Sequence, residues 1–267
     1  MNPKILYRDI DTSKEETDAI RNAGLLLTYS RMEISKNDLV IGRYSVLPYY
    51  KEQENDIKYV GAELINSFHQ HIYIADLSNW IDDLKDYTPR TWSRLEDLPD
   101  NMSFVLKGET NSKKQEWKTS MFAKDKKAAI EVHSRLCSDS LIGYQDIYIR
   151  EYVPLKTYML GIQDLPITKE FRFFVMYGQV IAGGYYWSNY FEDLEEKPDI
   201  KDVPKEFLDT IISIVGNKSN FYVIDVAETA VGDWIVIELN DGQMSGNSCI
   251  DVNEMYINMK RVLDEKK

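Results

Sequence analysis

Long hydrophobic runs and cysteines are both scarce in this 267-residue sequence. No run approaches the roughly 18 apolar residues that a membrane-spanning helix requires. The first residues, MNPKILYRDI, lack the pattern of a secretory signal. Two cysteines, Cys137 and Cys249, are too few for a disulfide framework or a zinc cluster, so we expect free thiols. These absences together predict a soluble, cytoplasmic protein with no membrane partner.

Basic residues are also in the minority. The chain has 32 Lys and Arg against 44 Asp and Glu, which gives a net charge of −12. An excess of negative charge disfavours non-specific binding to nucleic acid, although a local basic patch could still hold a phosphate ligand. Apolar residues make up 43% of the chain, enough for the core of one large domain or of two ordinary ones.

Alternating strand and helix patterns predict an α+β protein. In the N-terminal part we expect strands at 4–9, 25–29, 39–47 and 72–74, and helices at 13–24, 61–69 and 79–84. Ser13 would cap the first of these helices and Gly24 would end it. Pro89 interrupts the segment that follows, so we place a domain border near residue 95.

The rest of the sequence predicts two hairpins and three helices. We expect strands at 102–107, 147–153, 170–177, 180–187, 221–228 and 234–240, and helices at 124–138, 204–215 and 252–265. A two-residue turn at Gly178-Gln179 joins the first hairpin. A turn at Val231-Gly232-Asp233 joins the second.

The second hairpin carries a group of polar oxygens. Side chains alternate along a strand, so Glu238 and Asn240 share one face, while Ile237 and Leu239 point into packing on the other. Asp225 on the paired strand can come near them. Two carboxylates and an amide oxygen are ligands that Mg²⁺ accepts together with phosphate oxygens. The alternative is that these residues are solvated at a strand end.

Cations lie upstream in the sequence. A predicted strand ends at Lys107, and the polar loop after it carries Lys113 and Lys114. The loop is neither a Walker motif nor a GxGxxG motif, and a solvated surface loop is the alternative interpretation. Glu170 and Arg172 share one face of a later strand. Either they take part in a cross-strand ion pair, or Arg172 binds phosphate beside the Glu170 carboxylate.

In their order along the chain, these motifs resemble the ATP-grasp fold. The segments KGETNSKKQEW and EFRFFVMYGQVIAGGYY look like the R-two-K clade, small proteins common in bacteriophage and bacterial genomes. The resemblance covers roughly residues 100–250. GRYSVLPYY and GAELINS resemble the small α/β domain that precedes the grasp. The implied organisation is a pre-ATP-grasp-like domain at 1–95 and an ATP-grasp domain at 96–267, divided into a lid at about 100–150 and a larger subdomain at about 151–267.

The resemblance implies roles for particular residues at an ATP site. Lys107 would contact the α- and β-phosphates, with Lys113 or Lys114 as a second cation on the loop that covers the triphosphate. Glu170 would belong to the same nucleotide site, and Arg172 would face the γ-phosphate as a catalytic residue. The backbone of Glu151, Tyr152 and Val153 would meet the adenine edge. The magnesium ligands would be Asp225, Glu238 and Asn240.

Candidate substrate contacts lie in the N-terminal part and in the loop after Asn240. Arg43 and Asn66, in the N-terminal part, are the candidates for binding a carboxylate substrate, with structural turn residues as the alternative. Ser245 and Gly246 lie in DGQMSG, the loop where such enzymes often hold the acceptor.

The implied activity is an ATP- and Mg²⁺-dependent ligase that joins a carboxylate to an amine or a thiol through an acyl phosphate, releasing ADP and phosphate. Its partners would be small-molecule or peptide substrates. Two alternatives stay open. One is nucleotidyl transfer of the RNA-ligase kind with Lys107 adenylated, although Lys107-Gly108-Glu109 matches that motif poorly. The other is a non-catalytic ATP-binding interaction protein.

Overall fold

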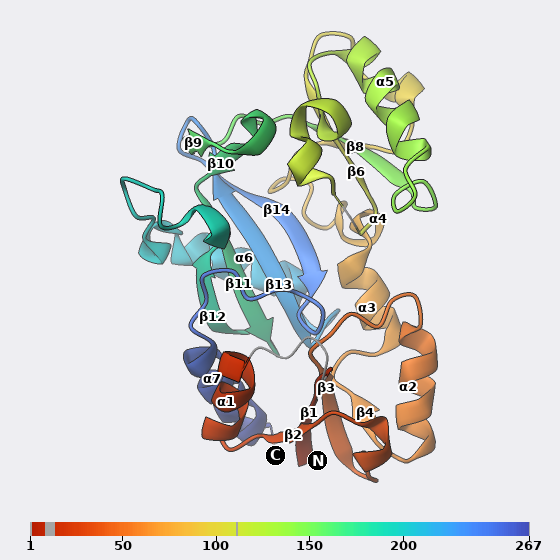
Figure 1. Ribbon diagram of the computed structural model, residues 1–267, viewed down its shortest axis with the longest axis vertical. Coiled ribbons are helices and arrows are strands. Elements are labelled where there is room, and N and C mark those ends of the chain that lie inside the picture. Colours follow the sequence, from red (N-terminus) through yellow and green to blue (C-terminus); the bar gives the residue numbers. More distant parts are fainter. Residues whose placement is uncertain (1, 9–13, 111, 267) are drawn as a thin grey trace.

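A computed structural model describes residues 2–8, 14–110 and 112–266. Ser13, the expected cap of the first helix, lies outside these residues. Within them the strands form three four-stranded sheets and one two-stranded ribbon. Figure 1 shows the three sheets one after another along the long axis, with the N-terminal sheet at one end.

The N-terminal sheet is parallel, with strand order β2-β1-β3-β4. Its strands are β1 (Asn2–Leu6), β2 (Leu26–Thr28), β3 (Asp38–Gly42) and β4 (Glu63–Leu64). Helices α1 (Lys14–Asn22) and α2 (Tyr50–Tyr59) cover opposite faces of this sheet. Successive residues of β1 show this arrangement, because Ile5 belongs to the core that contains α1 and Leu6 to the core that contains α2.

Two predictions in this part are wrong. The segment expected as a strand at 72–74 lies inside helix α3 (Phe68–Ala75), which Ser67 and Gln70 begin with a reciprocal capping box. The helix expected at 61–69 is replaced by β4 and the connection to α3. Helix α2 was not predicted, because its sequence, YKEQENDIKY, is almost entirely polar and buries a narrow stripe. A short helix α4 (Leu77–Trp80) covers only the start of the helix expected at 79–84.

The second sheet is small and antiparallel, with strand order β5-β8-β6-β7. It consists of β5 (Thr91–Trp92), β8 (Ile147–Glu151), β6 (Phe104–Gly108) and β7 (Phe122–Ala123). Helix α5 (Lys126–Cys137) packs on one face through Ala129, Val132 and Leu136. We call this unit the lid. The domain border near residue 95 stays a prediction, and β5 joins the lid from the N-terminal side of that border.

The largest sheet is antiparallel, with strand order β12-β11-β13-β14. It comprises β11 (Glu170–Met176), β12 (Gln179–Tyr185), β13 (Phe221–Glu228) and β14 (Trp234–Asp241). Helix α6 (Lys205–Val215) packs on one face, and α7 (Val252–Glu265) packs on the other. Figure 1 shows α1 beside α7, so the N-terminal unit and the large sheet share one core.

The remaining elements are short. A ribbon of β9 (Thr157–Leu160) and β10 (Pro166–Thr168) was not predicted. Single helical turns lie at Arg31–Glu33, Leu95–Asp97, Lys114–Glu116, Ile162–Asp164, Ser188–Tyr190 and Ile200–Asp202, and a π-helical turn lies at Trp117–Met121. None of the helices in the described ranges is both long and apolar enough to cross a bilayer.

Candidate functional site

A cleft lies between the lid and the large sheet. It contains about 900 Å³ of space, part of it open to solvent. Both sheets and the connections between them line it. The residues are Pro89, Val105, Lys107, Ser112, Lys114, Trp117, Met121, Arg150, Glu151, Tyr152, Val153, Leu155, Leu165, Pro166, Thr168, Glu170, Trp187, Ile235, Ile237 and Glu238. The lining combines many apolar side chains with a few charged ones, as in a pocket that orients its ligand.

A lysine from the lid meets a carboxylate from the large sheet across this cleft. Lys107 stands near the end of β6, and its ammonium forms an ion pair with Glu238 of β14. Lys107 is buried. Burial, with the positive charges of Arg150 and Lys114 nearby, lowers the pKa of Lys107 to about 7. The two predicted residues are therefore brought together, in a place where an additional anion would favour the charged lysine.

The two lysines of the predicted loop have different surroundings. Lys114 lines the cleft, its Nζ lies 2.6 Å from the Tyr186 hydroxyl, and it stands 4.8 Å from the ring centroid of Trp187. Lys113 does not line the cleft, and its Nζ lies 2.6 Å from Asp139. The structure therefore places Lys114, and not Lys113, where a cation could reach a ligand in the cleft.

The predicted adenine edge follows β8 at the apolar part of the cleft. The backbone N–H of Glu151 donates to Arg90 O at 2.8 Å, and that of Tyr152 donates to Ser103 O at 2.9 Å. The Glu151 carboxylate pairs with the Arg90 guanidinium at 2.8 Å. Among the hydrogen bonds of the described residues, none involves the N–H of Val153. Val153 is thus the one of the three predicted residues whose amide can serve a ligand.

Glu170 lies buried in the cleft wall with an incomplete set of partners. Its Oε2 accepts from the Thr168 hydroxyl at 3.3 Å, while Oε1 has no partner within the part of the chain that the structure describes. Burial raises the pKa of Glu170 to about 6, against the lowering effect of Lys114.

Arg150 is a cleft residue that the sequence interpretation missed. It is 7% exposed, and burial lowers its pKa to about 10. Its guanidinium donates to Ile237 O and, at 2.6 Å, to the Thr88 hydroxyl, while its Nε has no partner among the described residues. In the segment IYIRE, an arginine on an otherwise buried strand was the available signal.

Arg172 and Asp225 form a bidentate ion pair next to the cleft. The guanidinium donates to both Asp225 carboxylate oxygens at 2.8 Å and to Gly246 O at 2.9 Å. Asp225 lies opposite Glu238 in the β13–β14 register, as expected. Arg172, Asp225 and Asn240 are absent from the cleft lining, so their predicted contacts with phosphate or metal stay predictions.

A β-bulge changes which side chains of β14 face the cleft. Asp225 pairs with Glu238 while the next residue, Val226, pairs with Val236, so Ile237 is an extra residue in β14. Ile237 and Glu238 therefore both line the cleft. The expectation that Ile237 packs on the opposite side with Leu239 is wrong, although Leu239 is buried as expected.

The predicted acceptor loop, residues 241–246, and Asn247 directly after it are held from the N-terminal unit. Arg43 donates to Gly242 O at 2.5 Å, to Ser245 O at 3.1 Å and to the Asn247 side chain at 2.8 Å. Glu16 of α1 pairs with Arg43 at 2.9 Å and accepts from Asn247 at 3.0 Å. Arg43 is 8% exposed. This predicted substrate residue therefore binds the loop itself.

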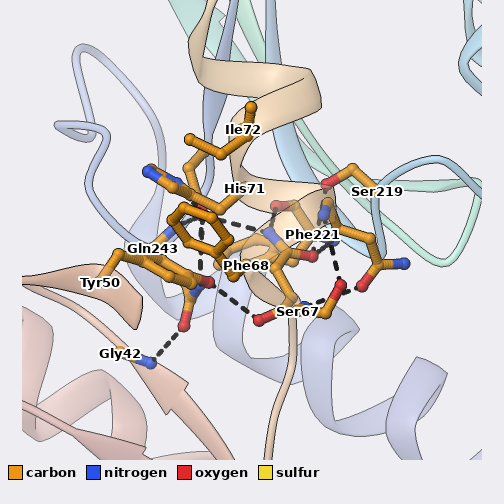
Figure 2. Close-up of polar contacts among 12 residues, drawn as sticks. Gly42, Tyr50, Ser67, Phe68, His71, Ile72, Ser219, Phe221 and Gln243 are labelled. Carbon is orange, nitrogen blue, oxygen red and sulfur yellow. Dashed lines mark hydrogen bonds and ion pairs between the residues drawn. The ribbon is translucent and has the colours of Figure 1, made fainter. Parts of the chain in front are cut away.

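The other side of the same loop is anchored by a buried polar cluster (Figure 2). Gln243 accepts from Gly42 N at 3.0 Å and donates to the Tyr50 hydroxyl at 2.7 Å. His71, which stacks on Tyr50, lies 3.0 Å from the Asp241 carboxylate.

Asn66 belongs to this cluster and is fully buried. Its side chain bonds both the N–H and the C=O of Phe221, at 3.0 and 2.7 Å. The structure thus uses this predicted substrate residue to hold the start of β13.

The predicted metal ligands are oxygen donors of the kind that take a magnesium ion together with a phosphate ligand, and this role stays a prediction. Within residues 2–8, 14–110 and 112–266, no group of three His, Cys, Asp or Glu side chains could hold a metal ion. Asp225 and Glu238 lie opposite each other on paired strands, with Asp225 bound to Arg172 and Glu238 to Lys107. Magnesium bound with nucleotides uses one or two carboxylates together with phosphate oxygens, which matches this set.

Comparison with known proteins identifies the fold. The family model for the ATP-grasp domain of the R-two-K clade, family 3, matches residues 95–259. No curated protein matches the chain.

Three solved structures align with almost all of it. One is a RiPP-associated ATP-grasp ligase from Chryseobacterium gregarium in complex with ADP and a leader and core peptide, with 11% identity, a TM-score of 0.63, and 100% of this chain and 98% of that chain covered. Another is the macrocyclase MdnC with its precursor peptide from Microcystis aeruginosa MRC (11%, 0.60, 98% and 99%). The third is the ligase PsnB with a precursor variant, Mg and ADP (12%, 0.56, 97% and 96%). These matches confirm the expected ATP-grasp fold.

Proposed function

The chain belongs to family 3 of the R-two-K clade of ATP-grasp domains, and we propose on this basis that it is an ATP- and magnesium-dependent ligase. It joins a carboxylate to an amine or a thiol and releases ADP and phosphate. The observation that carries the proposal is the meeting of Lys107 and Glu238 across the cleft between two sheets. An ammonium group from the lid and a carboxylate from the large sheet lie together. A triphosphate with its magnesium ion needs both, the ammonium to bind phosphate oxygens and the carboxylate to bind the metal.

The cations of the cleft account for triphosphate binding. Lys107 and Lys114 both lie in its lining, and Arg150 is buried beside them. In the absence of nucleotide, Glu238 balances Lys107. A triphosphate supplies the negative charge that Lys107 otherwise takes from Glu238, which leaves the carboxylate available for a cation. Buried charges of this kind are effective because the surrounding dielectric is low and the groups are already in place.

The apolar part of the cleft accounts for the nucleotide base. Trp117, Met121, Leu165 and Ile235 contribute to its walls, and the N–H of Val153 is available at its edge. A planar base needs these two features, apolar faces and a backbone donor for its edge.

The chemistry would proceed in two steps. A carboxylate oxygen of the substrate attacks the γ-phosphorus of ATP, the bond to the β-phosphate oxygen breaks, and ADP leaves. The amine or thiol then attacks the acyl carbon, the bond from that carbon to the phosphate oxygen breaks, phosphate leaves with the electron pair, and the nucleophile loses its proton. Lys107 and Lys114 stabilise the charge that moves during the first step. Magnesium, held by Asp225, Glu238 and Asn240, would supply neutralisation of the phosphate oxygens.

The test is incubation with labelled ATP and Mg²⁺ over a panel of amino acids and peptides. ADP and phosphate that depend on an added acceptor support the ligase. Glu238→Ala should abolish the Mg²⁺-dependent turnover with an unchanged circular dichroism spectrum, while Glu195→Ala, in an exposed loop, should retain it. Full activity of Glu238→Ala would refute the metal assignment. Tight ATP binding without turnover across the panel would favour a non-catalytic binding protein.

One observation favours a second candidate. A lysine whose pKa lies near 7 is partly uncharged at neutral pH, and an uncharged amine is a nucleophile. Lys107 could then attack the α-phosphorus, break its bond to the β-phosphate oxygen, lose a proton and release pyrophosphate. Protein labelled from α-labelled ATP, together with pyrophosphate, would indicate this adenylation, whereas ADP with unlabelled protein excludes it.

A further inference from the structure

A second hollow lies in the N-terminal unit, at the carboxyl ends of the parallel strands. The last residue of β1, the residues after β1, β2 and β3, and the exposed side of α2 line it: Leu6, Tyr7, Arg8, Tyr29, Arg31, Tyr44, Ser45, Val46, Leu47, Tyr49, Glu52 and Asp56. We call it the β1–β3 groove. It shares no lining residue with the cleft.

The topology explains why a groove opens at this place. The strand order β2-β1-β3-β4 means that the chain leaves β1 toward one edge of the sheet and leaves β3 toward the other. Helix α1 follows β1 on one face, and α2 follows β3 on the opposite face. The loops diverge between β1 and β3, which makes this the switch point where open parallel sheets bind their ligands.

The lining combines aromatic rings with balanced charges. The guanidinium of Arg8 stands 5.7 Å from the Tyr44 ring centroid, and Arg31 pairs with Asp56 at 2.8 Å. Glu52 lies one helical turn before Asp56 on α2, so the described part of the lining carries two cations and two anions. A polyphosphate would meet as many repulsive as attractive charges here. A ligand that carries one positive and one negative group is matched to both.

The groove also adjoins the predicted acceptor loop. Met244 of that loop packs in the same cluster as Tyr44 and Val46, which line the groove. Tyr7, another lining residue, donates to Glu16 at 2.7 Å, and Glu16 accepts from Asn247, the residue directly after the loop. A ligand in the groove would therefore lie against side chains that contact residues 241–247.

We propose that the β1–β3 groove binds a free amino acid in its zwitterionic form. Its carboxylate lies toward Arg8, its ammonium toward Glu52, and its side chain against Tyr29 and Tyr49, which are 40% and 64% exposed. That this amino acid is a substrate rests on the ligase function proposed above. Its binding does not, because the groove is separate from the nucleotide cleft.

The experiment measures binding of the twenty amino acids to the full chain by calorimetry, without nucleotide or magnesium. The best ligand is then compared with its N-acetyl derivative and its α-amide, each of which lacks one charge. We expect each derivative to bind at least about tenfold more weakly, the loss typical of one charge-assisted hydrogen bond. Arg8→Gln should bind the acid and the amide equally, and Glu52→Gln should bind the amine and its N-acetyl derivative equally.

Matched controls separate the groove from general surface effects. Tyr49→Ala should weaken binding about tenfold, whereas Tyr59→Ala, an exposed tyrosine at the other end of α2, should not. Glu206→Gln, in the first turn of α6, is the control for Glu52→Gln. The proposal is overturned if no amino acid binds at about 10 mM, or if the acid and the amide bind the unaltered chain equally. If an amino acid binds the groove but the protein shows no ATP turnover with any acceptor, the ligase proposal is overturned and the binding proposal stands.

Discussion

Replacing Glu170 with glutamine should stabilise the protein at neutral pH and leave its stability nearly unchanged under mildly acid conditions. Burial raises the pKa of Glu170 from its ordinary value of 4.5 to about 6. The difference corresponds to about 2 kcal/mol of folding free energy. Glutamine mimics the protonated side chain, because it is uncharged and keeps an oxygen that can accept from the Thr168 hydroxyl.

The direction of the pH dependence follows from proton binding. Between pH 4.5 and about 6 the unfolded chain releases the Glu170 proton while the folded chain retains it. The free energy of unfolding of the unaltered protein therefore falls as pH rises through this window. Glu170→Gln does not lose stability in this window. Its free energy of unfolding should therefore exceed that of the unaltered protein by nearly zero at pH 4 and by at most about 2 kcal/mol at pH 7.5.

Urea unfolding of both proteins at several pH values tests this. Subtracting one free energy of unfolding from the other removes the contributions of all other titrating groups, because both proteins share them. A difference that stays constant from pH 4 to pH 7.5 would refute the reasoning. A difference that grows in favour of the unaltered protein would mean that Lys114 and Arg172 outweigh burial and hold Glu170 ionised.

Two further substitutions follow from the site. Lys114→Ala should raise the Kd for ATP at least about tenfold, and Lys113→Ala should raise it less than about threefold, because of these two lysines only Lys114 lines the cleft. Equilibrium binding of ATP to both variants measures this, and equal Kd values would contradict the placement of Lys114. Asn66→Ala should lower the free energy of unfolding by about 3 kcal/mol, since buried backbone groups of Phe221 lose their partners. Urea unfolding measures this loss, with the exposed Asn253→Ala as control, and a loss below about 1 kcal/mol would contradict it.

The large sheet, together with β6, β8 and α5 of the lid, was predictable because its sequence patterns are local and strong. The two-residue strands β5 and β7 of the lid were not predicted. The hairpin of β13 and β14 shows two apolar runs around a glycine turn, and its register places Asp225 opposite Glu238 as expected. Lys107 was identified because a strand ends beside it. These inferences need only alternation along a strand and pairing between neighbours, which sequence carries directly.

Other features depend on contacts between distant segments. The bulge at Ile237 leaves no trace in the apolar pattern, because isoleucine suits either face of β14. Whether Lys113 or Lys114 reaches the cleft depends on Asp139 and Tyr186, both far away in sequence. Arg43 and Asn66 were candidates for substrate binding because buried polar side chains and ligand contacts look alike in a sequence. The partners that distinguish them lie about 150 to 200 residues further along the chain.

Those distant partners bear on how the units cooperate. Arg43 and Gln243 join the N-terminal unit to residues 241–247, and the same loop reaches Asp225 through Gly246 and Arg172. A rearrangement of the N-terminal unit would therefore disturb the loop and, through Arg172, a predicted magnesium ligand. Because α1 and α7 also share a core, separating this unit from the large sheet would expose apolar surface as well as break the hydrogen bonds from the buried Arg43 to Gly242 and Asn247. The lid has a core of its own, and its ion pair with the large sheet, Lys107 to Glu238, is one that a bound triphosphate would replace under the proposed function. We therefore expect the lid, and not the N-terminal unit, to move in any opening of the cleft.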